Sequence, residues 1–384
     1  MPVSIYLDHA ATSFPKPAVV CRRMSHMITR IGANPGRSDH KLARKANQVI
    51  NETREKIARL FAIPDAQRVI FTGNATEAIN LGLKGLLLPG DHALTSSVEH
   101  NSVIRPLKRL ERVGVKYSQV PCSPQGNLNF RLLQKSLKPK TKLIILTHAS
   151  NVTGSILPIQ EVGAFARSKG IFFMVDAAQT AGLLPIDVQK MNIDLLAGPG
   201  HKSLYGPQGT GFLYIANGVD LKPLKEGGTG TDSDSDEQPE TLPHGFESGT
   251  LNTPGIAGLG AGISFVLEQG IAKIWKKEKF LTQNLIQGLK RIKGIRVYGP
   301  GKMEERVPVV SFNVESMDPA EVGFLLDDLY DILVRTGLHC APHAHRTLGT
   351  FPAGTVRVSL GFFNTAEEIR ALLRAIHEIT RMKS

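Results

Sequence analysis

Short strand-like apolar runs alternate with helical patterns from about residue 66 to residue 215. The strand-like runs read RVIFTG, HALTSSVEH, VKYSQVP, KLIILTHAS, IFFMVDAAQ, IDLLAGPG and TGFLYIA. Helical candidates between them include ATEAINLGLKGLLL and PIQEVGAFARSKG, of which the second has apolar residues at helical spacing and ends at Gly170. Strand, helix and strand in repetition predict an α/β fold with a mainly parallel sheet that is covered on both faces.

The remainder of the chain predicts a second, smaller unit. Residues 256–293 read as a long helical region, and the segment from Gly294 to the C-terminus reads as an α+β unit. The sequence contains no internal repeat. With 384 residues, of which 41% are hydrophobic and 21% charged, the chain can bury a substantial core in one large domain or in two.

Three features predict a cytoplasmic protein. The chain has no run of about 18 apolar residues that could span a membrane. Its first residues, MPVSIYLDHAATSFPKP, lack the charged-then-apolar pattern of a signal peptide. Cys21, Cys122 and Cys340 form neither a CxxC pair nor an even disulfide set, which fits a reducing compartment.

The net charge of +12 raises the question of nucleic-acid binding, because clustered Lys and Arg residues neutralise phosphates. The basic residues are dispersed along the chain, however. The nearest approach to a cluster, KIWKKEKF at residues 273–280, is equally well explained as a solvated helix face. No zinc-finger spacing or aromatic RNA-binding signature accompanies it, so nucleic acid is an unfavoured partner.

Polar side chains follow the predicted strands of the larger unit. They are Thr76, His100, Asn151, Asp176, Gln179, His201 and Lys202. If the fold is a doubly wound sheet, these strand ends face one crevice, where ligands bind in such folds. Each residue alone has a simpler explanation: Asn151 as a turn former, His100 as a neighbour of a helix cap, Asp176 as a helix N-cap. The order and spacing of the whole set favour a binding site.

The set matches in kind what pyridoxal phosphate requires of a protein. That cofactor needs an amine for a Schiff base, a carboxylate beside its pyridine nitrogen, a hydrogen-bond donor for its phenolic oxygen and an anion site for its phosphate. Lys202, Asp176 and Gln179 supply the first three. The segment GNATEAIN reads as a helix that begins directly after a strand, so its free N–H groups can bind phosphate, and Thr76 can add a hydroxyl.

A second cluster lies in VRTGLHCAPHAHRTLG, residues 334–349, where Cys340 is surrounded by His339, His343 and His345. A zinc site is conceivable, but no second cysteine is near and adjacent His339 and Cys340 would rarely bind one ion. A reactive thiol is the favoured interpretation, because the histidines or Arg335 would favour the thiolate. The prediction is therefore a working cysteine without a metal.

The strand-like segment TVRVSLGFFNT carries Arg357. Because a guanidinium can hold a carboxylate through two hydrogen bonds, Arg357 is a candidate for binding the α-carboxylate of an amino-acid substrate. A structural ion pair is the alternative.

Taken together, these residues resemble the class V aminotransferase superfamily, and within it the cysteine desulfurases and selenocysteine lyases. The resemblance covers nearly the whole chain. It is carried by YLDHAATSFPKP, NPGRSDHKLA, TGNATEAIN, VEHNSVIRP, HASNVTGSILPI, VDAAQTAG, GHKSLYGPQGTG, FESGTLNTPGIAGL and RTGLHCAPHAHRTLGTFPAGTVRVSLGFFNT. Two departures from the family pattern are Pro199, where many members have a Ser or Thr that contacts the phosphate, and Leu338, where relatives often have a histidine.

The resemblance implies a fold type I pyridoxal phosphate enzyme that forms a homodimer with active sites at the subunit interface. It implies a large domain over residues 16–256, with a mainly parallel seven-stranded sheet, and a small α+β domain over 1–15 and 257–384 that includes the cysteine loop. The implied cofactor-binding residues are Ala75, Thr76, His100, Asn151, Asp176, Gln179, His201 and Lys202, together with Thr250 from the second subunit. The implied substrate-binding residues are Asn151, Arg335 and Arg357, and the implied catalytic residues are Lys202, His100 and Cys340.

The implied activity is conversion of L-cysteine to L-alanine, with the sulfur held as a persulfide on Cys340. An acceptor protein, as in iron–sulfur cluster assembly, would then receive the sulfur. Selenocysteine cleavage, transamination and β-elimination are alternatives on the same fold. A weakly catalytic sulfur carrier or a basic scaffold that binds tRNA or a partner protein is an alternative of another class.

Overall fold

The computed structural model describes residues 4–36, 39–231 and 234–382. Its centre is a seven-stranded sheet in the order β2-β8-β7-β6-β5-β3-β4. The strands are β2 (Val69–Thr72), β3 (His92–Ser96), β4 (Lys116–Val120), β5 (Thr141–Thr147), β6 (Phe172–Asp176), β7 (Leu195–Pro199) and β8 (Gly211–Ile215). Strands β3 to β7 run parallel, while β8 is antiparallel to both β2 and β7. The prediction of a mainly parallel sheet in an α/β fold is confirmed.

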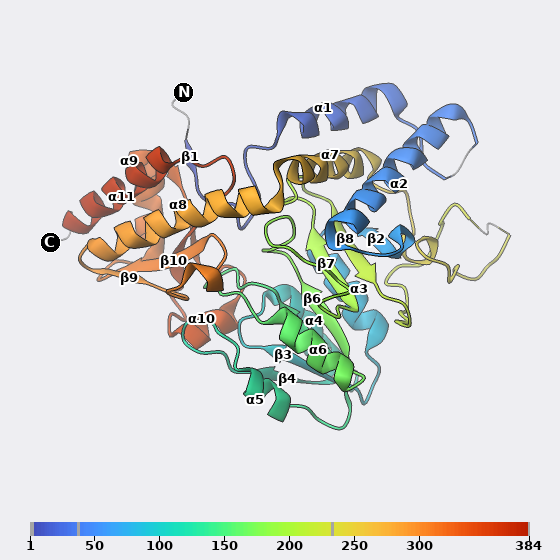
Figure 1. Ribbon diagram of the computed structural model, residues 1–384, viewed down its shortest axis with the longest axis horizontal. Helices are drawn as coiled ribbons and strands as arrows, with labels where there is room; N and C mark the ends of the chain where they lie inside the picture. The colour runs from blue at the N-terminus through green and yellow to red at the C-terminus, as the bar shows by residue number, and fades with distance from the viewer. Residues whose placement is uncertain (1–3, 37–38, 232–233, 383–384) are drawn as a thin grey trace.

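Both faces of this sheet are buried, which explains the uninterrupted apolar runs in its strands. In β5, Leu143 and Ile145 pack with helices α3 and α4, while Ile144 and Leu146 pack on the opposite face with α2, α6 and α7. The bounds of the covering helices are α2 (Lys41–Phe61), α3 (Ala75–Leu86), α4 (Asn101–Glu111), α6 (Ile159–Ser168) and α7 (Thr253–Gln269). Helix α1 (Ala18–His26) packs against α7, and α5 (Phe130–Lys135) contributes Leu133 to the core. Figure 1 shows these helices around the sheet.

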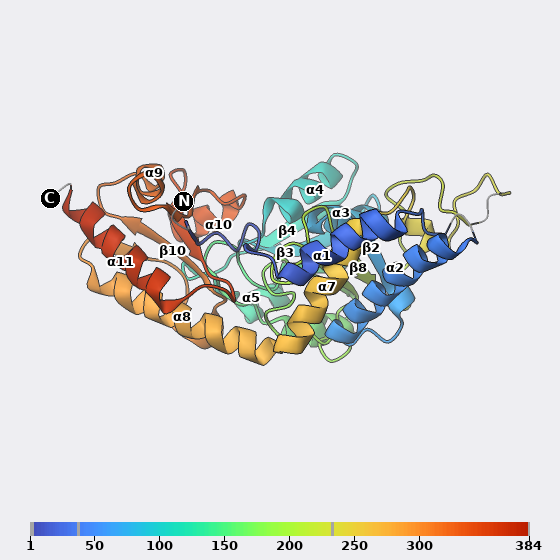
Figure 2. The same cartoon turned by 90° about the horizontal axis from the view of Figure 1, so that it is seen from above.

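The second unit is built on a four-stranded antiparallel sheet in the order β12-β13-β10-β9. Its elements are β9 (Ile295–Val297), β10 (Val309–Val314), β12 (Arg335–Gly337), β13 (Thr355–Ser359), α8 (Ile271–Arg291), α9 (Pro319–Tyr330), α10 (Pro342–Leu348) and α11 (Ala366–Arg381). Near the N-terminus, β1 (Ile5–Tyr6) pairs with β11 (Ile332–Leu333) beside this unit. Figures 1 and 2 show it at the opposite end of the molecule from α2.

The long helical region predicted over residues 256–293 is two helices rather than one. Helices α7 and α8 are bent by 81° at a break, where Gly270 has a φ of +78°. Helix α7 packs against α1 and α2, whereas α8 packs against α11. The domain boundary predicted after residue 256 falls inside α7.

No single helix in the described ranges is long and apolar enough to cross a membrane, although α7 and α8 taken as one bent pair meet that test by length and composition.

Buried Arg306 joins the two units. Arg306 is only 1% exposed. Its guanidinium donates hydrogen bonds to the carbonyl oxygens of Pro300 and Val309 at 2.8 Å each and of Thr153 at 3.3 Å. Because Thr153 follows β5 and Val309 begins β10, one side chain satisfies carbonyls from both units.

We expect Arg306→Met to lower the free energy of unfolding by about 2–4 kcal/mol, because it leaves several buried carbonyl oxygens without donors. Guanidinium chloride denaturation would measure the change. Arg291→Met, at the end of α8, is the control and is expected to change stability by less than about 0.5 kcal/mol. Equal stability of the two variants would contradict the joining role of Arg306.

Candidate active site

A cavity of about 230 Å³ opens where the parallel strands end. It is lined by predicted site residues, namely Ala75, Thr76, His100, Asn151, Asp176, Gln179, His201, Lys202, Arg335 and Arg357. Two predicted residues, Cys340 and Thr250, are not among the lining residues. The structure therefore brings together all the strand-end residues, and it adds two arginines from the smaller unit.

Lys202 and Asp176 supply an amine and a carboxylate to this cavity. Desolvation, reinforced by nearby Arg357, lowers the pKa of Lys202 to about 8, while Asp176 opposes that change. Asp176 ends β6, is 2% exposed and accepts a hydrogen bond from the N–H of Ala178 at 2.9 Å. Burial raises the pKa of Asp176. The amine is thus brought within reach of neutral pH, where a neutral lysine can act as nucleophile or base.

The N-terminal segment holds the backbone that carries Lys202. Ser13 Oγ donates to the carbonyl of Lys202 at 2.9 Å, and Lys16 Nζ donates to the carbonyl of His201 at 2.6 Å. His201 Nδ1 lies 3.1 Å from Thr12 Oγ1. Residues far apart in sequence therefore fix the position of the loop after β7.

His100 has both of the roles considered for it. It is the N-cap of α4, where its Nδ1 accepts a hydrogen bond from the N–H of Ser102 at 3.0 Å, and it also lines the cavity. Burial and the neighbouring positive charge of Lys202 lower the pKa of His100 to about 4. The ring is consequently neutral near pH 7, with its proton on Nε2 because Nδ1 is an acceptor.

The start of α3 has the local geometry that the predicted anion site requires. Helix α3 begins at Ala75, directly after β2, and Asn74 caps it by accepting from the N–H of Glu77 at 2.9 Å. Thr76 Oγ1 lies 2.8 Å from Ser102 Oγ, so a second hydroxyl stands beside it. Pro199, which also lines the cavity, offers no hydroxyl. Ser102 was not predicted, although it follows His100 within VEHNS.

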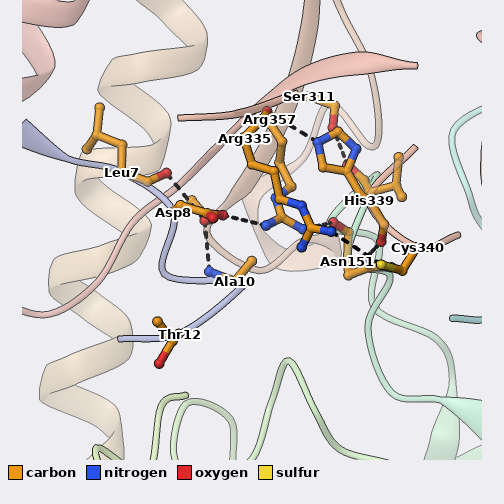
Figure 3. Close-up of polar contacts among 12 residues, drawn as sticks. Leu7, Asp8, Ala10, Thr12, Asn151, Ser311, Arg335, His339, Cys340 and Arg357 are labelled. Carbon is orange, nitrogen blue, oxygen red and sulfur yellow. Dashed lines mark hydrogen bonds and ion pairs between the residues drawn. The ribbon is translucent and has the colours of Figure 1, made fainter. Parts of the chain in front are cut away.

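Arg357 is 1% exposed and pairs with Asp8, whose Oδ1 lies 2.5 Å from Nη2 (Figure 3). Its Nη1 donates to the carbonyl of Asn151 at 3.2 Å, while its Nε is buried and has no hydrogen-bond partner among the residues that the structure describes. The ion pair considered as the alternative is therefore present, and the guanidinium still faces the cavity. Asp8 was not predicted, although it lies in the quoted motif YLDHAATSFPKP.

Cys340 is exposed and lies next to residues that line the cavity. Arg335 Nη2 donates to Cys340 Sγ at 3.3 Å, and Asn151 Nδ2 donates to the carbonyl of His339 at 2.7 Å (Figure 3). Because Arg335 and Asn151 both line the cavity, these two contacts hold the loop that carries the thiol beside it. The predicted association of Arg335 with the thiol is thus present.

The other cysteines have different surroundings. Burial raises the pKa of Cys122 to about 11, and Cys21 is exposed on α1. In the described part of the chain, no group of three or more His, Cys, Asp or Glu residues is arranged to hold a metal ion.

Thr250 lies apart from the cavity within the single chain. It lines a separate hollow, and Asn34 Nδ2 lies 3.4 Å from its Oγ1. Its role was expected from a second subunit, and it stays a prediction.

Glu99 is a fully buried carboxyl group that sequence reasoning missed. Its Oε1 accepts from Ser96 Oγ at 2.5 Å and its Oε2 accepts from the N–H of Thr147 at 2.9 Å. Burial raises its pKa to about 8, and the nearby Asp176 contributes in the same direction. Since Ser96 ends β3 and Thr147 ends β5, Glu99 joins two strand ends directly before His100.

We compared the chain with models of known protein families. The family model for aminotransferase class-V matches residues 5–372. The chain belongs to the class V aminotransferases. The match begins at β1 and ends within α11, so it includes both units and the cavity between the strand ends and Arg357.

Individual class V relatives are similar over nearly their whole length. A probable cysteine desulfurase of Methanothermobacter thermautotrophicus is 37% identical, with 98% of this chain and 95% of the relative covered. A cysteine desulfurase of Salmonella agona is 34% identical, with 98% and 93% covered. The apo structure of the cysteine desulfurase from Thermococcus onnurineus superimposes with a TM-score of 0.92 at 34% identity, with 99% and 95% covered. The fold and the family prediction are both confirmed.

Proposed function

We propose that this class V aminotransferase is a pyridoxal phosphate-dependent cysteine desulfurase with Cys340 as its sulfur acceptor. The observation that carries the proposal is the pairing of Arg335 with Cys340 Sγ at the rim of a cavity that contains Lys202 and Asp176. A transaminase would need the amine and the carboxylate but not a thiol at this position. The relatives named cysteine desulfurase support the same conclusion.

The residues of the cavity fit pyridoxal phosphate. Lys202 would hold the cofactor covalently, Asp176 would stand at the pyridine nitrogen, and Gln179 at the phenolic oxygen. The start of α3, with Ala75 and Thr76, would take the phosphate, where free helix N–H groups favour an anion. When bound, pyridoxal phosphate supplies an electron sink for the substrate Cα.

Three residues of the chain would then act on the substrate. Arg357 would hold the carboxylate of L-cysteine through its guanidinium at the cavity. Lys202 Nζ takes the proton from the substrate Cα. The Cys340 thiolate attacks the substrate sulfur, so that the C–S bond breaks as the S–S bond forms. The substrate carbon is reduced and leaves as L-alanine, the transferred sulfur is oxidised to a persulfide, and no further reactant is needed.

The lowered pKa of Lys202 predicts how cofactor capture depends on pH. A lysine amine is nucleophilic when neutral, so the rate at which apoprotein captures pyridoxal phosphate is expected to rise with pH, with a midpoint near the pKa of about 8. Stopped-flow absorbance from about pH 6.5 to about pH 11.5 would measure it, with free Nα-acetyl-lysine as the control, whose midpoint is about 10.4. A protein midpoint equal to that of the control would contradict the desolvation of Lys202.

Product balance tests the proposed reaction. With L-cysteine and a reductant, we expect alanine and sulfide in equal amounts. Without reductant, a single turnover should leave one additional sulfur on the peptide that contains Cys340, as measured by mass spectrometry. Pyruvate and ammonia as products would overturn the proposal in favour of elimination. A keto acid that still carries the substrate's sulfur would overturn it in favour of transamination.

The same proposal includes a setting for the enzyme. It would work as a cytoplasmic homodimer in which Thr250 of the second subunit reaches the phosphate, and it would deliver sulfur to an acceptor protein, for example in iron–sulfur cluster assembly. Alanine replacement of Thr250 tests the shared site: a larger dissociation constant for pyridoxal phosphate supports it, and an unchanged one contradicts it.

A further inference from the structure

The loop that carries Cys340 has an unusual backbone conformation. His339 and Cys340 have φ angles of +49° and +58°, in the left-handed region that residues with a Cβ seldom adopt. Two hydrogen bonds hold this turn from the larger unit. Asn151 Nδ2 donates to the carbonyl of His339 at 2.7 Å, and the N–H of Asn101 donates to the carbonyl of Cys340 at 2.8 Å. The left-handed turn is therefore fixed by contacts rather than by glycine.

The ring of His339 is buried in a chain of hydrogen bonds on the other side of the loop. His339 is 2% exposed, and its Nε2 lies 3.3 Å from the carbonyl oxygen of Arg335. Its Nδ1 lies 3.3 Å from Nε2 of His345, a residue with no exposed surface. Nδ1 of His345 lies 2.8 Å from Thr350 Oγ1. The chain therefore runs from Thr350 through two imidazoles to the backbone of Arg335.

The direction of each hydrogen bond follows from its acceptor. A carbonyl oxygen cannot donate, so His339 carries its proton on Nε2, and its Nδ1 accepts from Nε2–H of His345. Nδ1 of His345 then accepts from the hydroxyl of Thr350. Burial lowers the pKa of His345 to about 4 and the pKa of His339 well below its usual value, so both rings are neutral near pH 7. One tautomer of each ring satisfies the whole chain.

We propose that His339 is a positioning residue for the sulfur-accepting thiol: its ring, oriented by His345 and Thr350, holds the backbone of Arg335 so that the guanidinium stays against Cys340 Sγ. Strand β12 is a three-residue edge strand, so few backbone hydrogen bonds hold Arg335 in place. Two contacts therefore cross the same turn: His339 Nε2 contacts the backbone carbonyl of Arg335, and the side chain of Arg335 contacts Cys340 Sγ (Figure 3). The inference deepens the proposed function, because it rests on the role given there to Cys340.

The test compares alkylation of Cys340 by iodoacetate and by iodoacetamide in the full chain loaded with pyridoxal phosphate. Peptide mass spectrometry resolves Cys340 from the other cysteines. A guanidinium beside the sulfur attracts the anionic reagent, so the ratio of the two rate constants reports the position of Arg335. We expect His339→Asn to lower this ratio about threefold to fivefold, to the level of Arg335→Met. A change that merely loosens the fold would raise both rates together and leave the ratio unchanged.

The matched control is His339→Gln, because a glutamine amide can place an N–H group where histidine Nε2 stands, whereas asparagine cannot reach it. His339→Gln is expected to keep the wild-type ratio. The inference is overturned if folded His339→Asn keeps that ratio, or if His339→Gln loses it as completely as His339→Asn does.

A milder pair of variants applies if His339→Asn does not fold. Thr350→Val removes the hydroxyl that fixes the tautomer of His345, whereas Thr350→Ser keeps it. We expect the ratio to fall in Thr350→Val and not in Thr350→Ser, and equal ratios in the two would overturn the inference. Alkylation needs no turnover, so these results are independent of alanine formation. Failure of the proposed desulfurase reaction would therefore be recognised separately.

Discussion

Replacement of Lys202 by alanine is expected to lower the rate of alanine formation from L-cysteine by at least about 10⁴-fold. Lys202 has two proposed roles, as the amine that holds the cofactor and as the base at the substrate Cα, and the variant loses both. Among the described residues that line the cavity, Lys202 is the only lysine, so no other amine there can take its place. Desolvation also lowers its pKa to about 8. Single-turnover measurement of alanine, with the absorbance spectrum of the loaded protein, would record the loss.

The control for this variant is Lys169→Ala, an exposed lysine at the end of α6 that is distant from the cavity lining. It should keep the wild-type rate and spectrum. A small primary amine such as methylamine is expected to restore part of the activity of Lys202→Ala, because it can replace the missing base. Alanine formation by Lys202→Ala within tenfold of wild type would exclude Lys202 from both roles.

The sequence was most informative where burial leaves few alternatives. An uninterrupted run such as LIIL in β5 indicates a strand covered on both faces, and the structure has Leu143 and Ile144 on opposite faces of the sheet. The break between α7 and α8 was harder to predict from the sequence. Apolar residues continue at helical spacing on both sides of Gly270, and a single glycine is compatible with a continuous helix. Only the packing of α7 and α8 on different units distinguishes two helices from one.

The same contrast holds in the candidate active site. Asp176 and Lys202 could be predicted together because the carboxyl ends of parallel strands meet at one edge of the sheet. Asp8 could not, because its partner Arg357 is 349 positions away in the sequence and no local pattern connects them. The chain of hydrogen bonds from Thr350 to Arg335 could not be predicted from the sequence, for another reason. In the sequence its histidines read as groups that activate the thiol, with metal binding as the less favoured interpretation, and their hydrogen-bond partners became known only from the structure.

Replacement of Cys340 by alanine is expected to lower sulfide and alanine formation by about 10³-fold, which corresponds to a rise of about 4 kcal/mol in the barrier. The loss is smaller than that for Lys202→Ala, because Lys202, Asp176 and the carboxylate site at Arg357 remain intact. L-Cysteine should therefore still bind and still change the absorbance of the loaded enzyme. This combination of retained binding and lost sulfur transfer distinguishes a thiol that attacks sulfur from a thiol that only stabilises the loop.

Cys21→Ala is the matched control, because Cys21 is exposed on α1 and has no role in the proposed reaction. It should retain equal yields of alanine and sulfide. Arg335→Met is expected to lie between the two cysteine variants, because it keeps the thiol and removes only the donor 3.3 Å from it. If Cys340→Ala instead released sulfide at the wild-type rate while Arg335→Met did not, Arg335 would act on the substrate directly. The acceptor of sulfur would then be a group outside the loop between β12 and α10.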